Sequence, residues 1–336
     1  MKNRRLLGAA GSLLLAAFAG LACHLPSGLD ALGFACANAS DCGGSASLVC
    51  VARVCAVAGD GGSAGLPPDL SYPVRVVAYE LGYPHAWRDG AAFHPALGQY
   101  STQDPATLSA HLAGLHYAKV DVAMVTWWGS GRASDVAFNW VLDHVNGDPM
   151  RWAIQYLGDP AAPLAEKNAG FLLNDINSKF REDPSYWHIG GKNVVYVRSA
   201  ASQDPCDVAS RYVLGNQSQH GNAYLIVRTR AGSPPTCAQN PDAWLMDDAS
   251  KGSQRTDRIV NVSPGAQTVA GGSTLARNLV RFAEDLRSGL DGGTQLQWIT
   301  SFNDWGAGTA VEPATEWASD SGFGKYLDAL HDAPIR

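Results

Sequence analysis

The chain has 336 residues, with 25 Lys and Arg against 31 Asp and Glu, which gives a formal net charge of −6. This near balance excludes the clustered basic excess on which nucleic-acid binding depends, so we expect no nucleic-acid partner. Charged residues make up 17% and hydrophobic residues 46% of the chain, which excludes disorder and a long coiled coil for most of its length.

The N-terminus has the layout of an export signal, because three basic residues precede the apolar run Leu6–Leu21, which is too short for a membrane helix. We expect residues 1–22 to be a signal peptide. The run ends in Gly20-Leu-Ala-Cys23, which resembles a bacterial lipobox and favours a lipid anchor on Cys23. The protein would then be a surface or periplasm-facing outer-membrane lipoprotein. Ordinary cleavage and free secretion are the alternative.

The remaining cysteines are even in number, as expected of an exported protein with disulfides. They are Cys36, Cys42, Cys50, Cys55, Cys206 and Cys237. The first four are separated by five, seven and four residues, which fits zinc-binding spacing poorly and favours disulfides. The pairs Cys36–Cys50 and Cys42–Cys55 are one of three connectivities. We expect residues 23–71 to form a short Cys-rich segment, or stub, that starts at the lipid-anchor Cys23 and ends in a Gly- and Pro-rich linker. Residues 72–336 should form the main domain.

Eight short β-branched or apolar runs follow, separated by longer helical patterns. The predicted strands are Val74–Tyr79, Val120–Thr126, Trp152–Tyr156, Val194–Val197, Tyr224–Val227, Ala243–Met246, Ile259–Val262 and Leu296–Thr300. The predicted helices are Pro105–His116, Asp135–Val145, Glu166–Phe180, Cys206–Gln219, Thr274–Leu290 and Gly322–Leu330. This alternation predicts an α/β fold, a (β/α)8 TIM barrel in which the connections after the fifth and sixth strands are short of helix. A doubly wound open sheet is the alternative, but no Gly-x-Gly-x-x-Gly motif follows a strand.

Functional groups of such barrels lie where the strands end. This criterion selects Glu80, Trp127, Trp128, Gln155, Tyr156, Arg198, Arg228, Asp247, Asp248, Ser263, Asn303 and Asp304. Successive strand residues point to opposite faces, so one residue of each adjacent pair is expected to pack away from the mouth. The scattered His residues give no metal-binding spacing, and we expect no metal and no cofactor.

Four segments together resemble glycoside hydrolase family 99, the endo-α-mannosidase-like barrels, in order and spacing over Tyr72–Leu330. They are His94-Pro-Ala-Leu-Gly-Gln-Tyr-Ser-Thr-Gln-Asp-Pro105 with His111, Val120-Asp-Val-Ala-Met-Val-Thr-Trp-Trp-Gly129, Asp183-Pro-Ser-Tyr-Trp187 with Gly191-Lys-Asn-Val-Val-Tyr-Val197, and Ser301-Phe-Asn-Asp-Trp-Gly-Ala-Gly-Thr-Ala-Val-Glu-Pro313. The resemblance implies a glycan-cleaving enzyme with two Glu, three positions apart, after the last strand. One assists the sugar 2-hydroxyl and the other is the general acid/base.

The chain departs from this pattern where the chemistry lies. The first Glu of the pair falls on Asp304 and the second on Ala307, which cannot donate a proton. Gln155 replaces a further Glu of the family. The sequence therefore excludes a mannosidase that uses the family's catalytic residues unchanged, so an active enzyme would need a replacement acid. The candidates near the same rim are Glu312, Glu316, Asp247, Asp248 and Glu80, although Glu312 also fits a loop-fixing acceptor.

The sequence predicts a monomeric barrel that hydrolyses internal bonds of a mannan-like polysaccharide or glycan. The catalytic candidates are Asp304, Glu312 and Asp247, and the substrate-binding candidates are Trp128, Trp305, Tyr156, Gln155, Glu80, Asn303 and Arg198. For Trp305, stacking on a sugar and packing in the core are both open. The rival interpretation, based on Ala307 and Gln155, is a catalytically inactive barrel that binds glycan at the cell surface.

Overall fold

The computed structural model describes residues 48–51, 54–57, 66–157, 166–200, 202–218, 221–230, 234–268, 272–290 and 293–335. The predicted signal peptide, Cys23, Cys36 and Cys42 lie outside these residues. Strands β1 (Leu48–Val51) and β2 (Val54–Val57) pair antiparallel, with Cys50 and Cys55 at opposite register positions. The disulfide pairing of these four cysteines stays a prediction. Within the described ranges, no helix has the length and apolar character needed to cross a membrane.

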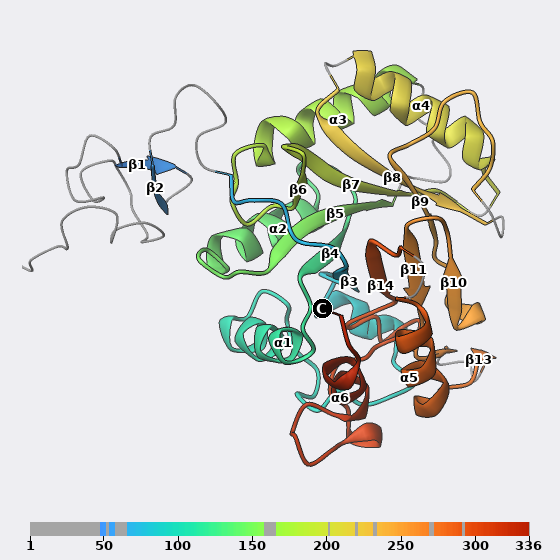
Figure 1. Cartoon of the computed structure of the whole chain (residues 1–336). Helices are drawn as coiled ribbons and strands as arrows, with labels where there is room; N and C mark the ends of the chain where they lie inside the picture. Colours follow the sequence, from blue (N-terminus) through green and yellow to red (C-terminus); the bar gives the residue numbers. More distant parts are fainter. Residues whose placement is uncertain are drawn as a thin grey trace, which may run out of the picture.

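Eight parallel strands form the wall of a nearly closed barrel (Figure 1), in the order β11, β14, β3, β4, β5, β7, β8, β9. They are β3 (Val74–Tyr79), β4 (Val122–Trp127), β5 (Arg151–Leu157), β7 (Lys192–Arg198), β8 (Ala223–Thr229), β9 (Ala243–Met246), β11 (Ile259–Val262) and β14 (Leu296–Ile299). All eight predicted strands are present, and the (β/α)8 prediction is confirmed. The strands read as nearly continuous apolar runs because helices cover them outside and side chains fill the barrel inside.

The two ends of this row, β9 and β11, meet without a backbone ladder among the described residues. The short strand β10 (Ser253–Arg255) pairs antiparallel with β11. Directly after it, the hydroxyl of Thr256 donates to the carbonyl oxygen of Trp244 in β9 at 2.7 Å. The amide N–H of Asp248, just after β9, donates to the side-chain oxygen of Gln254 at 2.9 Å. Side chains of the β10 segment therefore close the seam.

The helices lie on the outside of the strands (Figure 1). They are α1 (Pro105–Tyr117), α2 (Ala133–His144), α3 (Glu166–Phe180), α4 (Pro205–Ser218), α5 (Leu279–Ser288) and α6 (Lys325–Asp332). Asp104 caps α1 by accepting from the Thr107 N–H at 3.1 Å, with Pro105 at the first helical position. Each of these helices agrees with a predicted one to within a few residues, except for the start of α5.

The prediction of a helix from Thr274 is wrong. Strand β13 (Ser273–Leu275) pairs with β12 (Ala266–Gln267), and α5 begins only at Leu279. Asn278 caps it by accepting from the Arg281 N–H at 3.0 Å. The helix start is set by this local cap, whereas β13 depends on a strand that the sequence pattern did not reveal.

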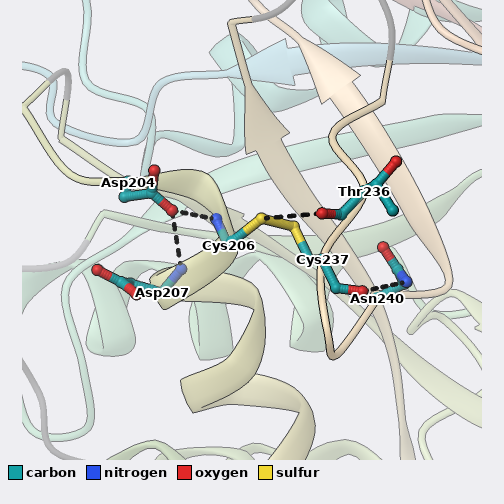
Figure 2. The surroundings of a disulfide bond; sticks show 6 residues. All are labelled: Asp204, Cys206, Asp207, Thr236, Cys237 and Asn240. Atoms are coloured by element: carbon teal, nitrogen blue, oxygen red, sulfur yellow. Dashed lines mark hydrogen bonds between the residues drawn. A yellow bond between two sulfur atoms is a disulfide. The ribbon is translucent and has the colours of Figure 1, made fainter.

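The connections after β8 and β9 contain no α-helix in their described residues, as predicted. A disulfide between Cys206, in the first turn of α4, and Cys237, in the β8–β9 connection, joins two segments 31 residues apart (Figure 2). Asp204 accepts from the Cys206 N–H at 2.8 Å, and the Asn240 side chain donates to the Cys237 carbonyl at 3.1 Å. The disulfide thus fastens a helix-free connection to the outer helical layer.

Candidate functional site

A cavity of about 140 Å³ opens where the parallel strands end at their carboxyl termini, the position at which barrel enzymes carry their active sites. Side chains from five strands and from the segments that follow β3, β9 and β14 surround it. The lining residues are Ala78, Tyr79, Glu80, Thr126, Gln155, Leu157, Arg198, Asp247, Trp298, Thr300, Ser301 and Asp304. Below it, the rings of Tyr196 and Trp298 meet edge to face, with centroids 5.1 Å apart, and fill the barrel.

Asp304 lies in a tightly folded loop after β14. Its backbone N–H donates to the Ser301 hydroxyl at 2.9 Å, and one carboxylate oxygen accepts from the Ala307 N–H at 3.0 Å. Gly308, at φ +63°, passes so close to Gln267 that an added Cβ would lie 1.9 Å from the Gln267 carbonyl oxygen. Only Gly fits there, so the loop is fixed on both sides and holds the Asp304 carboxylate at the cavity.

Glu80 follows β3 directly and faces the same cavity as Asp304. Its backbone is fixed by Asn303, and one carboxylate oxygen accepts from the Gly82 N–H at 2.7 Å. Burial raises the pKa of the Glu80 carboxyl, and the negative charge of Asp304 raises it further. Hydrogen bonds from Gly82 and Thr126 offset part of this effect, which leaves the pKa at about 7. Glu80 is therefore poised to hold a proton near neutral pH.

Asp247, which follows β9, is ion-paired with two arginines. One carboxylate oxygen contacts the Arg198 guanidinium at 2.6 Å, and the other contacts the guanidinium of Arg228. Burial lowers the pKa of Arg198, but the charge of Asp247, helped by Asp304, outweighs this effect and raises it overall. Because both oxygens of the buried Asp247 are engaged by cations, neither is free to carry a proton to a substrate.

Glu312 lies behind the loop, not in the cavity wall, and is 1% exposed. One of its oxygens accepts from the Tyr100 hydroxyl at 2.6 Å and from the indole N–H of Trp305 at 2.9 Å. The other is 3.1 Å from Nε2 of His111, whose Nδ1 is 2.7 Å from the hydroxyl of Tyr79. This buried network matches the loop-fixing alternative for Glu312 and ties the loop to α1 and β3.

The predicted aromatic binding residues lie in different environments. Trp128 is 52% exposed at the end of β4, while its neighbour Trp127 is fully buried and donates to Asp135 at 3.1 Å. Trp305 is fully buried and stacks on Trp317, so its ring belongs to the core and offers no face to a sugar. Tyr156 is also buried and lies outside the cavity wall, towards Tyr212 of α4. Of these predicted platforms, only Trp128 presents an open ring.

Gln155 does line the cavity, while Tyr156 beside it points outwards, as strand alternation requires. Asn303 is fully buried beneath the wall and contributes through its hydrogen bonds to Glu80. Sequence reasoning missed Tyr79, Thr126 and Thr300. Thr300 lies two residues after the lining residue Trp298, so strand alternation would have indicated it.

A second and larger hollow, of about 700 Å³, lies between the C-terminal ends of α2 and α3, at the opposite end of the strands. Its polar lining includes Asp143, Glu182 and Asp183, but this is the face at which barrels carry stability, not chemistry. Across the described residues, no three His, Cys, Asp or Glu side chains are grouped in a way that would hold a metal ion.

The fold and the site together define a (β/α)8 barrel with a carboxylate-lined cavity at the carboxyl ends of its strands. Residues 79–224 match the model of glycosyl hydrolase family 99, from the last residue of β3 to the start of β8. The Asp304 loop lies beyond the matched range. A curated relative, the glycoprotein endo-alpha-1,2-mannosidase of Xenopus laevis, is 31% identical over 108 residues, which is 32% of this chain and only 20% of that protein.

Solved structures show the same fold. The family 99 endo-alpha-mannosidase of Bacteroides thetaiotaomicron, solved in complex with bis-tris-propane, has a TM-score of 0.64 at 18% identity, covering 78% of this chain and 97% of its own. A glycoside hydrolase-like protein has a TM-score of 0.56 at 15% identity, covering 79% and 95%. The barrel therefore has the fold of the family 99 endo-α-mannosidases, and the sequence match to that family lies within it.

Proposed function

We propose that this protein is a glycoside hydrolase that cleaves internal α-mannosidic bonds of a mannan-like polysaccharide or glycan. The observation that carries this proposal is the placement of Asp304 and Glu80 on one cavity, at the carboxyl ends of the strands of a family 99-like barrel. Glycosidic cleavage needs a pair of carboxyl groups, one to supply a proton and one to assist the anomeric centre from another side.

Asp304 is the carboxylate assigned to the sugar. It occupies the position that the family resemblance gives to the group acting on the 2-hydroxyl, and its loop holds it at the cavity. Trp128, with half of its ring exposed at the rim, supplies a surface on which the apolar face of a sugar can stack. The ion-paired Asp247 and the buried Glu312 are not suited to donate the proton, and we assign them to positioning.

The test is release of new reducing ends from a panel of α-mannans and α-linked manno-oligosaccharides, with Asp304→Asn as the matched variant. We expect internal cleavage by the wild type and loss of at least 100-fold in kcat for the variant. Binding of the same oligosaccharides in calorimetry without any cleavage would replace this proposal by the inactive, glycan-binding alternative, which the absence of family carboxylates at Ala307 and Gln155 favours.

We also propose that the barrel works outside the cytoplasm, exported by residues 1–22 and held at a membrane through lipidated Cys23. The basic start, the apolar run and the lipobox-like end support this. Mass spectrometry of the mature N-terminus of the protein and of a Cys23→Ser variant tests it. A freely secreted wild type with an unmodified Cys23 would exclude the anchor.

A further inference from the structure

We propose that Glu80 is the general acid/base of this barrel, in place of the family carboxylate whose position is occupied by Ala307. The inference rests on the proposed function and adds the identity of the proton donor. It also moves the donor from the loop after β14 to the end of β3, on a different strand of the barrel.

The candidates can be compared directly. Three carboxyl groups line the cavity among the described residues, those of Glu80, Asp247 and Asp304. Asp247 has both oxygens in contact with guanidinium groups, and Asp304 is assigned to the sugar 2-hydroxyl. One oxygen of the Glu80 carboxyl accepts from the Gly82 N–H, and the Thr126 side chain and the Leu81 backbone also donate to this carboxyl. Of these three groups, Glu80 is the one that is neither ion-paired nor assigned to the sugar 2-hydroxyl.

The position of Glu80 is fixed through its main chain. Asn303 accepts from the Glu80 N–H at 2.7 Å and donates to the Glu80 carbonyl oxygen at 3.0 Å. Asn303 precedes Asp304 in the chain, so the two proposed catalytic carboxyl groups are held by one rigid connection between β3 and the last loop. A catalytic pair must keep its geometry to well within 1 Å, which such a connection provides.

The electrostatic surroundings of Glu80 favour its protonated form, which a general acid requires. The other titratable groups around it are Asp304, Asp247, Arg198, Tyr79 and Tyr83. Burial raises the pKa of both tyrosines, so they stay neutral. Arg198 and Arg228 both contact Asp247, and Arg198 also interacts with the charge of Asp304, so the two arginines and the two aspartates balance while Glu80 is protonated. The negative charge of Asp304 favours the protonated form of Glu80.

The reaction balances with these two groups alone. Glu80 gives its proton to the glycosidic oxygen as the C1–O bond breaks and its electron pair goes to that oxygen. The sugar 2-hydroxyl oxygen bonds to C1 and passes its proton to Asp304. A water molecule then attacks C1 and gives one proton to Glu80, while the C1–O2 bond breaks, its electron pair goes to O2, and Asp304 returns its proton to O2. The net change is addition of one water, and both carboxyl groups regain their starting states.

The experiment compares the wild type, Glu80→Gln and the surface control Glu182→Gln on two substrates. One is α-mannan, whose leaving alcohol needs a proton, and the other is an α-mannobioside with a 2,4-dinitrophenyl leaving group, which does not. We expect Glu80→Gln to lose about 10²–10⁴-fold in kcat on mannan but less than about 10-fold on the activated substrate. Glu182→Gln should match the wild type on both.

Two further readouts separate a catalytic from a structural role. The kcat/KM of the wild type on mannan should fall as the pH rises through about 7, and this fall should be absent from the pH profile of Glu80→Gln. With azide, Glu80→Ala should form a mannobiosyl azide from the activated substrate. Equal losses of Glu80→Gln on both substrates, or full activity on mannan, would overturn the inference alone. A wild type inactive on both substrates would overturn it together with the proposed function.

Discussion

Asn303 holds the backbone of Glu80 in both directions, accepting from its N–H at 2.7 Å and donating to its carbonyl oxygen at 3.0 Å. The two residues are 223 positions apart in sequence, and Asn303 is fully buried. This connection joins the first and last strands of the barrel directly at the cavity. It makes the placement of Glu80 dependent on the loop that carries Asp304.

Asn303→Ala should therefore lower activity without removing any reacting group. We expect a loss of at least 10-fold in kcat with KM nearly unchanged, and a stability loss of about 2–3 kcal/mol from two buried hydrogen bonds. Steady-state kinetics on α-mannan and urea unfolding measure the two effects, with exposed Asn146→Ala as the control. A rise in KM at constant kcat would show that Asn303 serves binding instead.

The raised pKa of Glu80 predicts a pH-dependent stability. Its pKa is about 7 in the folded protein against 4.5 for an ordinary Glu side chain, so folding favours the protonated form. The stability that the protonated Glu80 carboxyl contributes is fully present below about pH 4.5 and is lost as the pH rises through about 7. Because Gln does not titrate, the stability of Glu80→Gln relative to the wild type should increase from pH 5 to pH 8. The increase should be about 1–2 kcal/mol after allowance for partial exposure of the Glu80 side chain.

Thermal unfolding of both proteins at pH 5, 6, 7 and 8 checks this difference. The Asp304→Asn background is the matched control, because removal of that negative charge lowers the pKa of Glu80 and should shrink the effect. A stability difference that is constant with pH would mean that the Glu80 carboxyl titrates normally.

Glu312→Gln tests whether the buried network fixes the loop. The amide can accept on only one atom and would point an N–H₂ group at donors such as Tyr100 or Trp305. We expect a loss of about 2–4 kcal/mol in the free energy of unfolding. The kcat should fall equally for α-mannan and for the dinitrophenyl substrate. Selective loss on mannan in a protein of normal stability would instead identify Glu312 as the proton donor.

The sequence predicted the strands well because each wall strand is buried on both faces and reads as a short apolar run. The same reasoning located Glu80, Gln155, Arg198 and Asp304 at the cavity, since each sits at a strand end. What it could not decide depends on contacts between distant segments. The ion pairs of Asp247 join it to two other strands, and the burial of Glu312 depends on a tyrosine 212 positions away.

The side-chain directions in the last loop were also beyond the sequence. Within a strand, alternation separates inward from outward residues, and it correctly separated Trp127 from Trp128. In the loop there is no such period, and the ring of Trp305 turns away from the cavity to stack on Trp317. Strand β13 escaped prediction for a related reason, because its partner β12 is only two residues long.

The Cys206–Cys237 disulfide should stabilise the barrel by restraining the unfolded chain. For two cysteines 31 residues apart, loop closure accounts for about 3–4 kcal/mol. We expect the double variant Cys206→Ser, Cys237→Ser to lose up to this amount in urea unfolding, with activity at low denaturant unchanged because neither residue lines the cavity. Dithiothreitol should reproduce the loss in the wild type and leave the double variant unaffected. An unchanged wild-type midpoint in dithiothreitol would show that the two thiols are not bonded.

Trp128→Ala tests the exposed ring at the rim. Because about half of the side chain already faces solvent, its removal should cost under about 1 kcal/mol of stability, while the lost stacking should raise KM for oligosaccharides by about 5- to 20-fold, or 1–2 kcal/mol. The kcat should change little, since stacking acts on substrate and transition state alike. Phe171→Ala, a residue of α3 that is equally exposed at 53%, is the matched control and should leave KM unchanged. If Trp128→Ala binds α-linked manno-oligosaccharides as tightly as the wild type does, the sugar lies elsewhere on the rim.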